Sequence, residues 1–502
     1  MSEDSFDVAI TGGRVIDPET GLDDVRNVGV RGNEIAAVTS EAITGDSTID
    51  ASGLVVVPGF IDMHQHNTPS PFGQHLALRD GVTTTLELEA GVYPVDRWYG
   101  SLEGKSRTNF GASVGMLGIR EHVLNDGYVT SNSGDFMLDF MLPPDQATTS
   151  MRWSTQVATP DQIEQFAAML EQGIGQGSVG VGFAVGYAVA GCTQEESVIC
   201  QRLAGKYGEA VFMHGRFSSQ MPPTGGILSI LELMGPQEVY GGGLVVQHMT
   251  AQTLNETPAA LKLIDNAREQ GIQVIAEIYP YNYGASVAMA PYLHPDNYQR
   301  NMGRDYGDII ETSNLKPLTK ERYDELQKTA PGTSIMFYNA TEQTVYDALA
   351  HPSTVLGSDA FPFTLIDSGD QAWDWDVAFD SVTGHPRGSG SHARLLAWVR
   401  DKKVDIPWSL AVSKMSYMIA RFLEDNGVPQ MADKGRIQEG KDADITIFDP
   451  DAVTDNGTMK QGALPSTGIP HVLVNGTVVV KDSKALDDVF PGKAIHGQPA
   501  TQ

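Results

Sequence analysis

Short apolar segments alternate with longer, partly helical connections from residue 59 to about 420, and this alternation limits the fold more than any other feature of the sequence. Helices are predicted in two of the connections, at residues 160–172 and 258–270. The apolar segments predict eight strands, which end near His66, Glu89, Gly118, Ala184, His214, His248, Tyr279 and Asp359. Eight strands that alternate with helical segments predict an α/β fold, a (β/α)8 TIM-type barrel. An active site in such a barrel lies at the carboxyl ends of the strands.

The two ends of the chain show a different pattern, in which short strands are separated by turns. The segment from Val472 to Val480 predicts a hairpin around Asn475-Gly476. Because both ends are strand-rich, we expect residues 1–58 and 425–490 to form one β-sandwich beside a barrel of residues 59–424. The connection at 285–353 is too long for a structureless loop in a compact domain, which predicts an inserted subdomain or lid.

The composition excludes several classes of function. The chain has 34 Lys and Arg against 63 Asp and Glu, a formal net charge of -29, so it should repel nucleic acid and anionic membrane surfaces. Residues 1–5 lack the basic and apolar regions of a signal peptide, and no apolar run approaches the length of a membrane span. Two cysteines make no disulfide framework. These features predict a cytoplasmic protein, and they are compatible with a homo-oligomer.

The first predicted strand ends in a pair of histidines, His64-Gln65-His66. Residues two apart in a strand point to the same face, so the two imidazoles should project side by side at its carboxyl end. The alternative is that the two histidines are ordinary polar residues at the start of a loop. At the end of a buried barrel strand, the pair is suited to hold a metal ion.

Three further strand ends carry possible metal ligands. The second strand closes with Glu87 and Glu89 on one face, and a carboxylate inside a barrel is costly unless it is paired or bound to metal. Glu89 is the predicted ligand because it is nearer the carboxyl end, with Glu87 one layer deeper. The fifth and sixth strands end in His214 and His248. The alternatives are basic partners for the glutamates and ordinary polar roles for the histidines.

Asp359 ends the last predicted strand. A carboxylate at this place can accept a proton from a metal-activated water and return it to a leaving amine. Its alternative role is to cap the helix that follows.

Taken together, these motifs resemble the amidohydrolase superfamily and, within it, the D-aminoacylase (N-acyl-D-amino-acid deacylase) branch. The resemblance extends over nearly the whole chain. It includes the metal motifs, Tyr279-Pro280-Tyr281, His385-Pro386-Arg387, Gly440-Lys441-Asp442-Ala443-Asp444 and the segment from Gly468 to Gly476.

The resemblance implies a hydrolase that uses one or two zinc ions. The residues that match metal ligands of the family are His64, His66, His214 and His248, and Asp359 matches its catalytic acid and base. Tyr187 and Arg387 match residues that hold the carboxylate of the substrate, a task for which the planar guanidinium is suited.

Two positions depart from the branch. It usually has a cysteine ligand at the end of the second strand, where this chain has Glu89-Ala90-Gly91; Glu89 is one residue short of that place and is the predicted substitute. The branch also tends to have a lysine two residues after the histidine of the sixth strand, where this chain has Thr250. Arg216, two residues after His214, is predicted to replace that charge near the substrate.

The predicted function is hydrolysis of the acyl amide bond of a small N-acyl amino acid, with the D configuration favoured over the L. A metal-activated water would attack the amide, with Asp359 as general base and acid. The alternative enzyme is a cyclic-amide hydrolase similar to dihydroorotase or hydantoinase. Those relatives commonly bridge two metals with a carboxylated lysine, and no lysine ends the fourth strand at residues 181–184. A silent scaffold is the other alternative, but each expected ligand position is filled.

Overall fold

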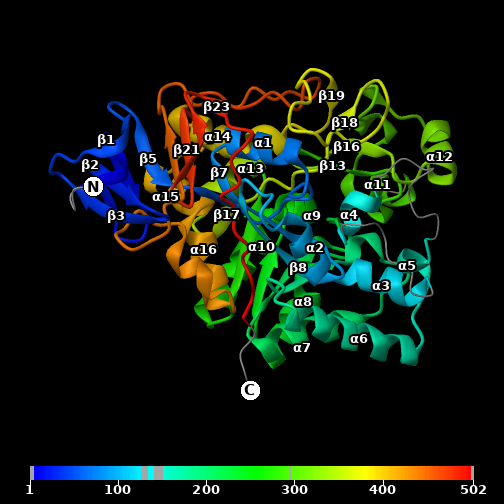
Figure 1. The fold of residues 1–502 in the computed structure, drawn as a ribbon. Helices are drawn as coiled ribbons and strands as arrows, with labels where there is room; N and C mark the ends of the chain where they lie inside the picture. Colours follow the sequence, from blue (N-terminus) through cyan, green and yellow to red (C-terminus); the bar gives the residue numbers. More distant parts are fainter. Residues whose placement is uncertain (1–4, 126–133, 141–150, 294, 499–502) are drawn as a thin grey trace.

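The computed structural model describes residues 5–125, 134–140, 151–293 and 295–498 (Figure 1). Residues 1–4 lie outside the described residues. They are part of the segment 1–5 that was predicted to lack the features of a signal peptide. None of the helices in the described ranges is both long enough and apolar enough to cross a membrane.

A sheet of eight parallel strands forms the centre of the molecule, in the order β17-β12-β11-β10-β9-β8-β7-β6. The strands are β6 (Phe60–Asp62), β7 (Val82–Val92), β8 (Asn109–Gly115), β9 (Val181–Ala184), β10 (Ala210–His214), β11 (Gly243–Val246), β12 (Val274–Ile278) and β17 (Thr354–Leu356). The first and last strands meet just beyond their ends, where the backbone N–H of His66 donates to the carbonyl of Ala360 at 2.8 Å. This contact closes the sheet, so the predicted (β/α)8 barrel is confirmed.

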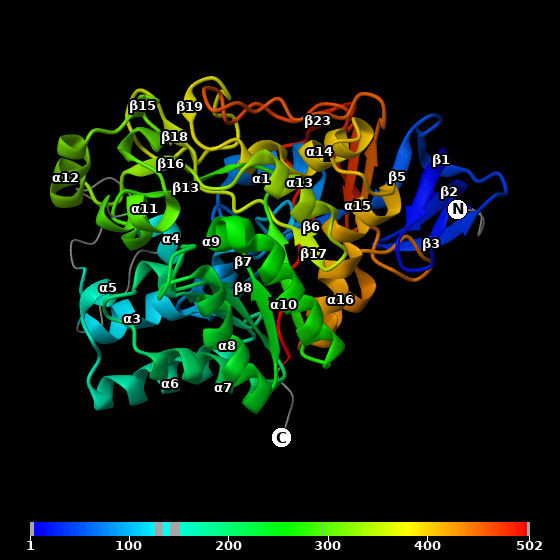
Figure 2. The ribbon, with the colours of Figure 1, turned by 180° about the vertical axis from the view of Figure 1, so that it is seen from behind.

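Helices surround the barrel and are shown from both sides in Figures 1 and 2. They include α1 (Pro71–Arg79), α2 (Val95–Leu102), α3 (Met116–Leu124), α4 (Phe136–Phe140), α5 (Arg152–Thr155), α6 (Pro160–Gly175), α7 (Gln194–Tyr207), α8 (Gly226–Tyr240), α9 (Met249–Thr253), α10 (Thr257–Glu269), α13 (Glu342–Ala350), α14 (Arg387–Arg400), α15 (Trp408–Met415) and α16 (Tyr417–Asp425). The two helices predicted from the sequence are α6 and α10. Helix α6 begins where it does because Thr159 and Gln162 form a capping box.

The two ends of the chain meet in one nine-stranded mixed sheet. Its strands are β1 (Phe6–Asp17), β2 (Leu22–Arg31), β3 (Glu34–Thr39), β4 (Gly45–Asp50), β5 (Val55–Pro58), β20 (Ile445–Phe448), β21 (His471–Val474), β22 (Thr477–Lys481) and β23 (Lys484–Ala485). The ends join where β5 pairs antiparallel with β20, with Val56 opposite Ile447. The predicted Asn475-Gly476 turn connects β21 to β22, and both residues have positive φ, 46° and 76°, as a tight hairpin requires.

A four-stranded sheet lies within the long connection between β12 and β17. It consists of β13 (Tyr283–Val287), β14 (Ile309–Glu311), β15 (Lys316–Pro317) and β16 (Ser334–Tyr338), accompanied by α11 (Pro295–Met302) and α12 (Lys320–Thr329). Figures 1 and 2 show α12 on the side of the molecule opposite to β1–β3. This is the predicted inserted subdomain. We retain the boundaries 1–58 with 425–490, 59–424 and 285–353 as proposals.

Candidate metal centre

His64 and His66 follow β6 and turn their rings toward the carboxyl ends of the neighbouring strands. The Nε2 atoms of His64 and His66 lie 3.5 and 3.4 Å from Oε2 of Glu89. They lie 3.3 and 3.4 Å from Oδ1 of Asp359. All four side chains are buried. The structure thus brings the histidine pair together with both predicted carboxylates.

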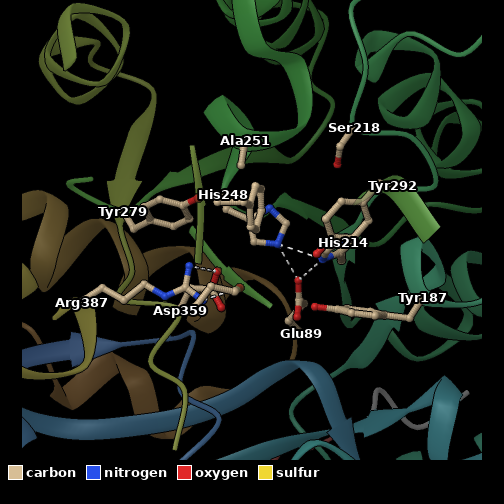
Figure 3. Close-up of a pocket in the computed structure, with 12 residues that line it drawn as sticks. Glu89, Tyr187, His214, Ser218, His248, Ala251, Tyr279, Tyr292, Asp359 and Arg387 are labelled. Atoms are coloured by element: carbon tan, nitrogen blue, oxygen red, sulfur yellow. Dashed lines mark hydrogen bonds and ion pairs between the residues drawn. The ribbon is translucent and has the colours of Figure 1, made fainter. Parts of the chain in front are cut away.

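The other oxygen of Glu89 faces the second pair of histidines. Oε1 of Glu89 lies 2.8 Å from Nδ1 of His214 and 2.7 Å from Nε2 of His248. The two imidazole nitrogens are 3.0 Å apart. Figure 3 shows the carboxylate of Glu89 reaching toward both rings. Glu89, on β7, therefore lies between the two histidine pairs.

The side chains of this cluster are of the types that bind a metal ion. Three groups of its side chains have ligand atoms within 4.8 Å of one another, namely His64–His66–Glu89, His64–His248–Asp359 and Glu89–His214–His248. The buried Nε2 atoms of His64 and His66 have no hydrogen-bond partner among the described residues. Buried polar atoms are rarely left unpaired, and imidazole with carboxylate is a ligand set that zinc favours.

Two further carboxylates contact the Nδ1 atoms of the first pair of histidines. Glu87 lies with its two oxygens 3.0 and 2.9 Å from Nδ1 of His66. Glu277 lies with Oε2 2.8 Å from Nδ1 of His64. A carboxylate on Nδ1 leaves Nε2 free to bind a metal, and it fixes the orientation of the ring. The sequence analysis missed Glu277, although a carboxylate within the apolar strand Val274–Ile278 was a signal that could have indicated it.

The neighbouring carboxylates raise the pKa of both histidines of the first pair, His64 and His66. Burial alone would lower the pKa of His64, but Asp359, Glu89 and Glu277 outweigh it and raise that pKa to about 10. Burial would raise the pKa of Glu89, and the charges of His214 and His64 instead hold it well below its usual range. In the absence of an ion His64 therefore holds a proton, and a cation bound here would replace this positive charge.

Asp359 makes a second contact, with an arginine from another element. Its Oδ2 lies 2.8 Å from Nη1 of Arg387, the first residue of α14. Asp359 follows β17 in a left-handed backbone conformation, with φ of 53°. Arg387 packs over the rings of Tyr279 and Phe361, at 5.0 and 5.2 Å from the ring centroids. Because Oδ2 is held by the guanidinium, Oδ1 is left facing the histidines.

A pocket opens beside this cluster, and its walls are largely aromatic. It is lined by Glu89, Tyr187, His214, Ser218, His248, Ala251, Tyr279, Ala285, Tyr292, Phe337, Asp359 and Arg387 (Figure 3). Tyr187 lies at the end of a short 3-10 helix, Val185–Tyr187, and its hydroxyl is 3.2 Å from that of Ser286 in the insertion. Both predicted carboxylate-binding residues, Tyr187 and Arg387, line this pocket.

The structure places Arg216 outside this lining. Its Nε and Nη2 donate to Glu232 of α8 at 2.9 and 2.7 Å, and Nη1 donates to the carbonyl of Cys192 at 2.9 Å. Thr250, which stands where the branch has lysine, is fully buried. Arg387 is the only arginine or lysine among the described lining residues.

Known proteins similar to this chain share its length and its fold. A model of the amidohydrolase family matches residues 47–113. The N-acyl-D-glutamate deacylase of Alcaligenes xylosoxydans xylosoxydans is 26% identical over 512 residues, which cover 95% of this chain and 94% of the relative. The D-aminoacylase of the same organism is also 26% identical, over 94% of each chain. This chain is similar to the amidohydrolases.

The fold of this chain is also found in a solved structure. The N-acyl-D-glutamate deacylase from Bordetella bronchiseptica, complexed with zinc and a phosphonate inhibitor, superimposes with a TM-score of 0.74. It is 23% identical, and the match covers 98% of this chain and 100% of the other. The resemblance to the D-aminoacylase branch that was inferred from the sequence is confirmed, and so is the prediction of a hydrolase similar to the N-acyl-D-amino-acid deacylases.

Proposed function

We propose that this protein is a zinc-dependent hydrolase that cleaves the acyl amide bond of N-acyl amino acids, preferentially those of D configuration. The observation that carries the proposal is the buried carboxylate of Glu89 between two pairs of histidines, beside a pocket that contains an arginine. The names of the similar proteins, N-acyl-D-glutamate deacylase and D-aminoacylase, support the reaction and the configuration.

The residues that would hold one or two zinc ions are His64, His66, Glu89, His214 and His248. Zinc bound by such a set polarises the amide carbonyl and makes water more acidic. These side chains are at most 5% exposed, so the reaction would proceed away from bulk solvent, where charges interact more strongly.

Asp359 is the proposed general base and acid. Its Oδ2 is held by Arg387, which leaves Oδ1 directed to the histidines and able to accept a proton from the attacking water. The same oxygen would then return the proton to the nitrogen of the leaving amino acid. The pair with Arg387 keeps this carboxylate in one orientation through both transfers.

Arg387 and Tyr187 are the proposed partners of the substrate carboxylate. The Nε atom of Arg387 is buried and has no hydrogen-bond partner among the described residues, so one donor is available to a ligand. Arg216 is occupied by Glu232, and Thr250 carries no charge. With one cation in the lining, the pocket suits a substrate with a single carboxylate, which means an amino acid with a neutral side chain.

We keep the cytoplasm as the proposed location and a small molecule as the proposed partner. Both cysteines, Cys192 and Cys200, are buried and unpaired, as is usual in reducing compartments. The acidic net charge argues against nucleic acid as a partner.

The test is a hydrolysis screen of paired N-acetyl-D- and N-acetyl-L-amino acids, with metal content measured on the same samples. Protein stripped of metal by a chelator should be inactive and should recover activity as zinc is restored. We expect N-acetyl-D-leucine and N-acetyl-D-methionine to be cleaved faster than N-acetyl-D-glutamate. Full activity of the metal-free protein, or cleavage of cyclic amides alone, would overturn the proposal.

A further inference from the structure

Glu277 contacts both histidine pairs of the metal centre through one oxygen atom. This residue lies on β12 and is fully buried. Its Oε2 is 2.8 Å from Nδ1 of His64 and accepts the backbone N–H of His248 at 2.9 Å. The carboxylate of Glu277 therefore contacts the side chain of His64 in the first pair and the backbone of His248 in the second pair.

The backbone of His248 requires such support. His248 follows β11 with φ of 34°, in the left-handed region that non-glycine residues seldom adopt. A conformation of this kind costs about 1–3 kcal/mol and persists only when neighbouring contacts maintain it. The hydrogen bond to Glu277 holds the N–H of this residue in place, and with it the start of α9, from which the ring is directed at Glu89.

The position of Glu277 depends on a glycine in the adjacent strand connection. A Cβ atom added at Gly357 would lie 2.8 Å from both Cγ and Cδ of Glu277 and 2.9 Å from Oε1. Such distances are too short for unbonded atoms, so an alanine at 357 would displace the carboxylate without removing its charge. This provides a second way to disturb the same contact.

Glu87 is a natural comparison within the same centre. It is also a fully buried glutamate beneath a ligand, but both of its oxygens contact His66. It therefore supports a ligand on one side of Glu89 only.

We propose that Glu277 is a positioning residue that couples the two halves of the metal centre. It orients His64 with Nε2 free, and it fixes the backbone that presents His248, so its loss should weaken metal binding at both places. This inference rests on the proposed metal site and adds a residue to it that does not contact the ion.

The test measures zinc affinity by competition with a fluorescent chelator in two backgrounds. The variant His214→Asn retains the metal position formed by His64, His66 and Glu89. The variant His66→Asn retains the position formed by Glu89, His214 and His248. Adding Glu277→Leu should weaken zinc binding in both backgrounds, by about 10–100-fold, the usual effect of losing a partner behind a ligand. Adding Glu87→Leu should weaken it only in the His214→Asn background.

Gly357→Ala should reproduce the pattern of Glu277→Leu with a smaller loss, and it tests the inference if the leucine variant does not fold. Glu277→Gln, which retains an acceptor oxygen, should recover part of the affinity. Loss of affinity in one background only, or in neither, would overturn the coupling while leaving the proposed function intact. If the unmodified protein binds no zinc, the proposed function fails and the inference fails with it.

Discussion

The two histidine pairs on either side of Glu89 are held by different means. The Nδ1 atoms of His64 and His66 face the carboxylates of Glu277 and Glu87 at 2.8–3.0 Å. The Nδ1 atom of His248 instead faces the neutral side-chain amide of Gln252 at 3.3 Å. The Nε2 atom of His214 has no hydrogen-bond partner among the described residues.

This difference matters because hydrogen bonds to an ionised group are shorter and about twice as strong as neutral ones. The first pair is therefore oriented before any ligand arrives. The proposed general base, Asp359, lies on the same side, with its Oδ1 3.3 Å from Nε2 of His64. The rings of the second pair have no carboxylate on the side away from Glu89, so we expect them to adjust more readily. We therefore refer to the first pair as the fixed side and to the second pair as the adaptable side, and Glu89 contacts both.

The largest effect should come from Glu89→Ala, which removes the group that both sides share. We expect metal content to fall at both positions and activity to fall to background, because a carboxylate oxygen is lost from each pair. Glu87→Gln is the matched control. It retains an acceptor for His66, so it should keep most of the metal and chiefly lower the melting temperature. Metal analysis with the opposite ranking would show that Glu87 is the ligand.

The next largest effect should come from Asp359→Asn, on the fixed side. This variant should retain metal and fold but lose about 10²–10⁴-fold in kcat, the usual contribution of general acid–base catalysis. The measurement is kcat with zinc content and circular dichroism on the same samples. Unchanged kcat would indicate that Asp359 serves only as a partner of Arg387.

Arg387→Lys should change substrate preference more than folding. A lysine ammonium cannot keep the contact with Asp359 and also offer the donor that Nε of Arg387 directs to a substrate carboxylate. We expect the wild type to favour N-acyl amino acids over the matching N-acyl amino amides by about 2–5 kcal/mol in kcat/KM, the scale for a buried charge pair, and the variant to lose most of that preference. Equal rates for acid and amide in the wild type would contradict the carboxylate anchor and favour the cyclic-amide alternative.

Gln252→Ala should have the smallest effect, on the adaptable side. The amide is neutral and its contact with His248 is long, so we expect a loss of zinc affinity of no more than about 10-fold, the lower end for a supporting residue. Chelator competition against Glu87→Ala gives the comparison. A loss equal to that of Glu87→Ala would mean that the two pairs are held equally firmly.

The sequence by itself determined the barrel and most of the residues of its centre. Apolar strands of regular spacing produce a parallel sheet, and polar side chains at their ends converge at one rim because the strands are parallel. His64, His66, Glu89, His214 and His248 meet for this reason, although they come from four different strands. The strand pattern predicted that these side chains meet at one rim, and the resemblance to the amidohydrolases identified the histidines as expected metal ligands.

Only the tertiary structure determined the hydrogen-bond and ion-pair partners of the residues around the centre. Arg216 was predicted near the substrate from its distance to His214 along the chain, but Glu232 of α8 draws its guanidinium away. Glu277 and Arg387 reach His64 and Asp359 from other elements, at separations of 213 and 28 residues. Side-chain direction and ion pairing depend on which elements pack against each other, and strand patterns carry no information on that packing.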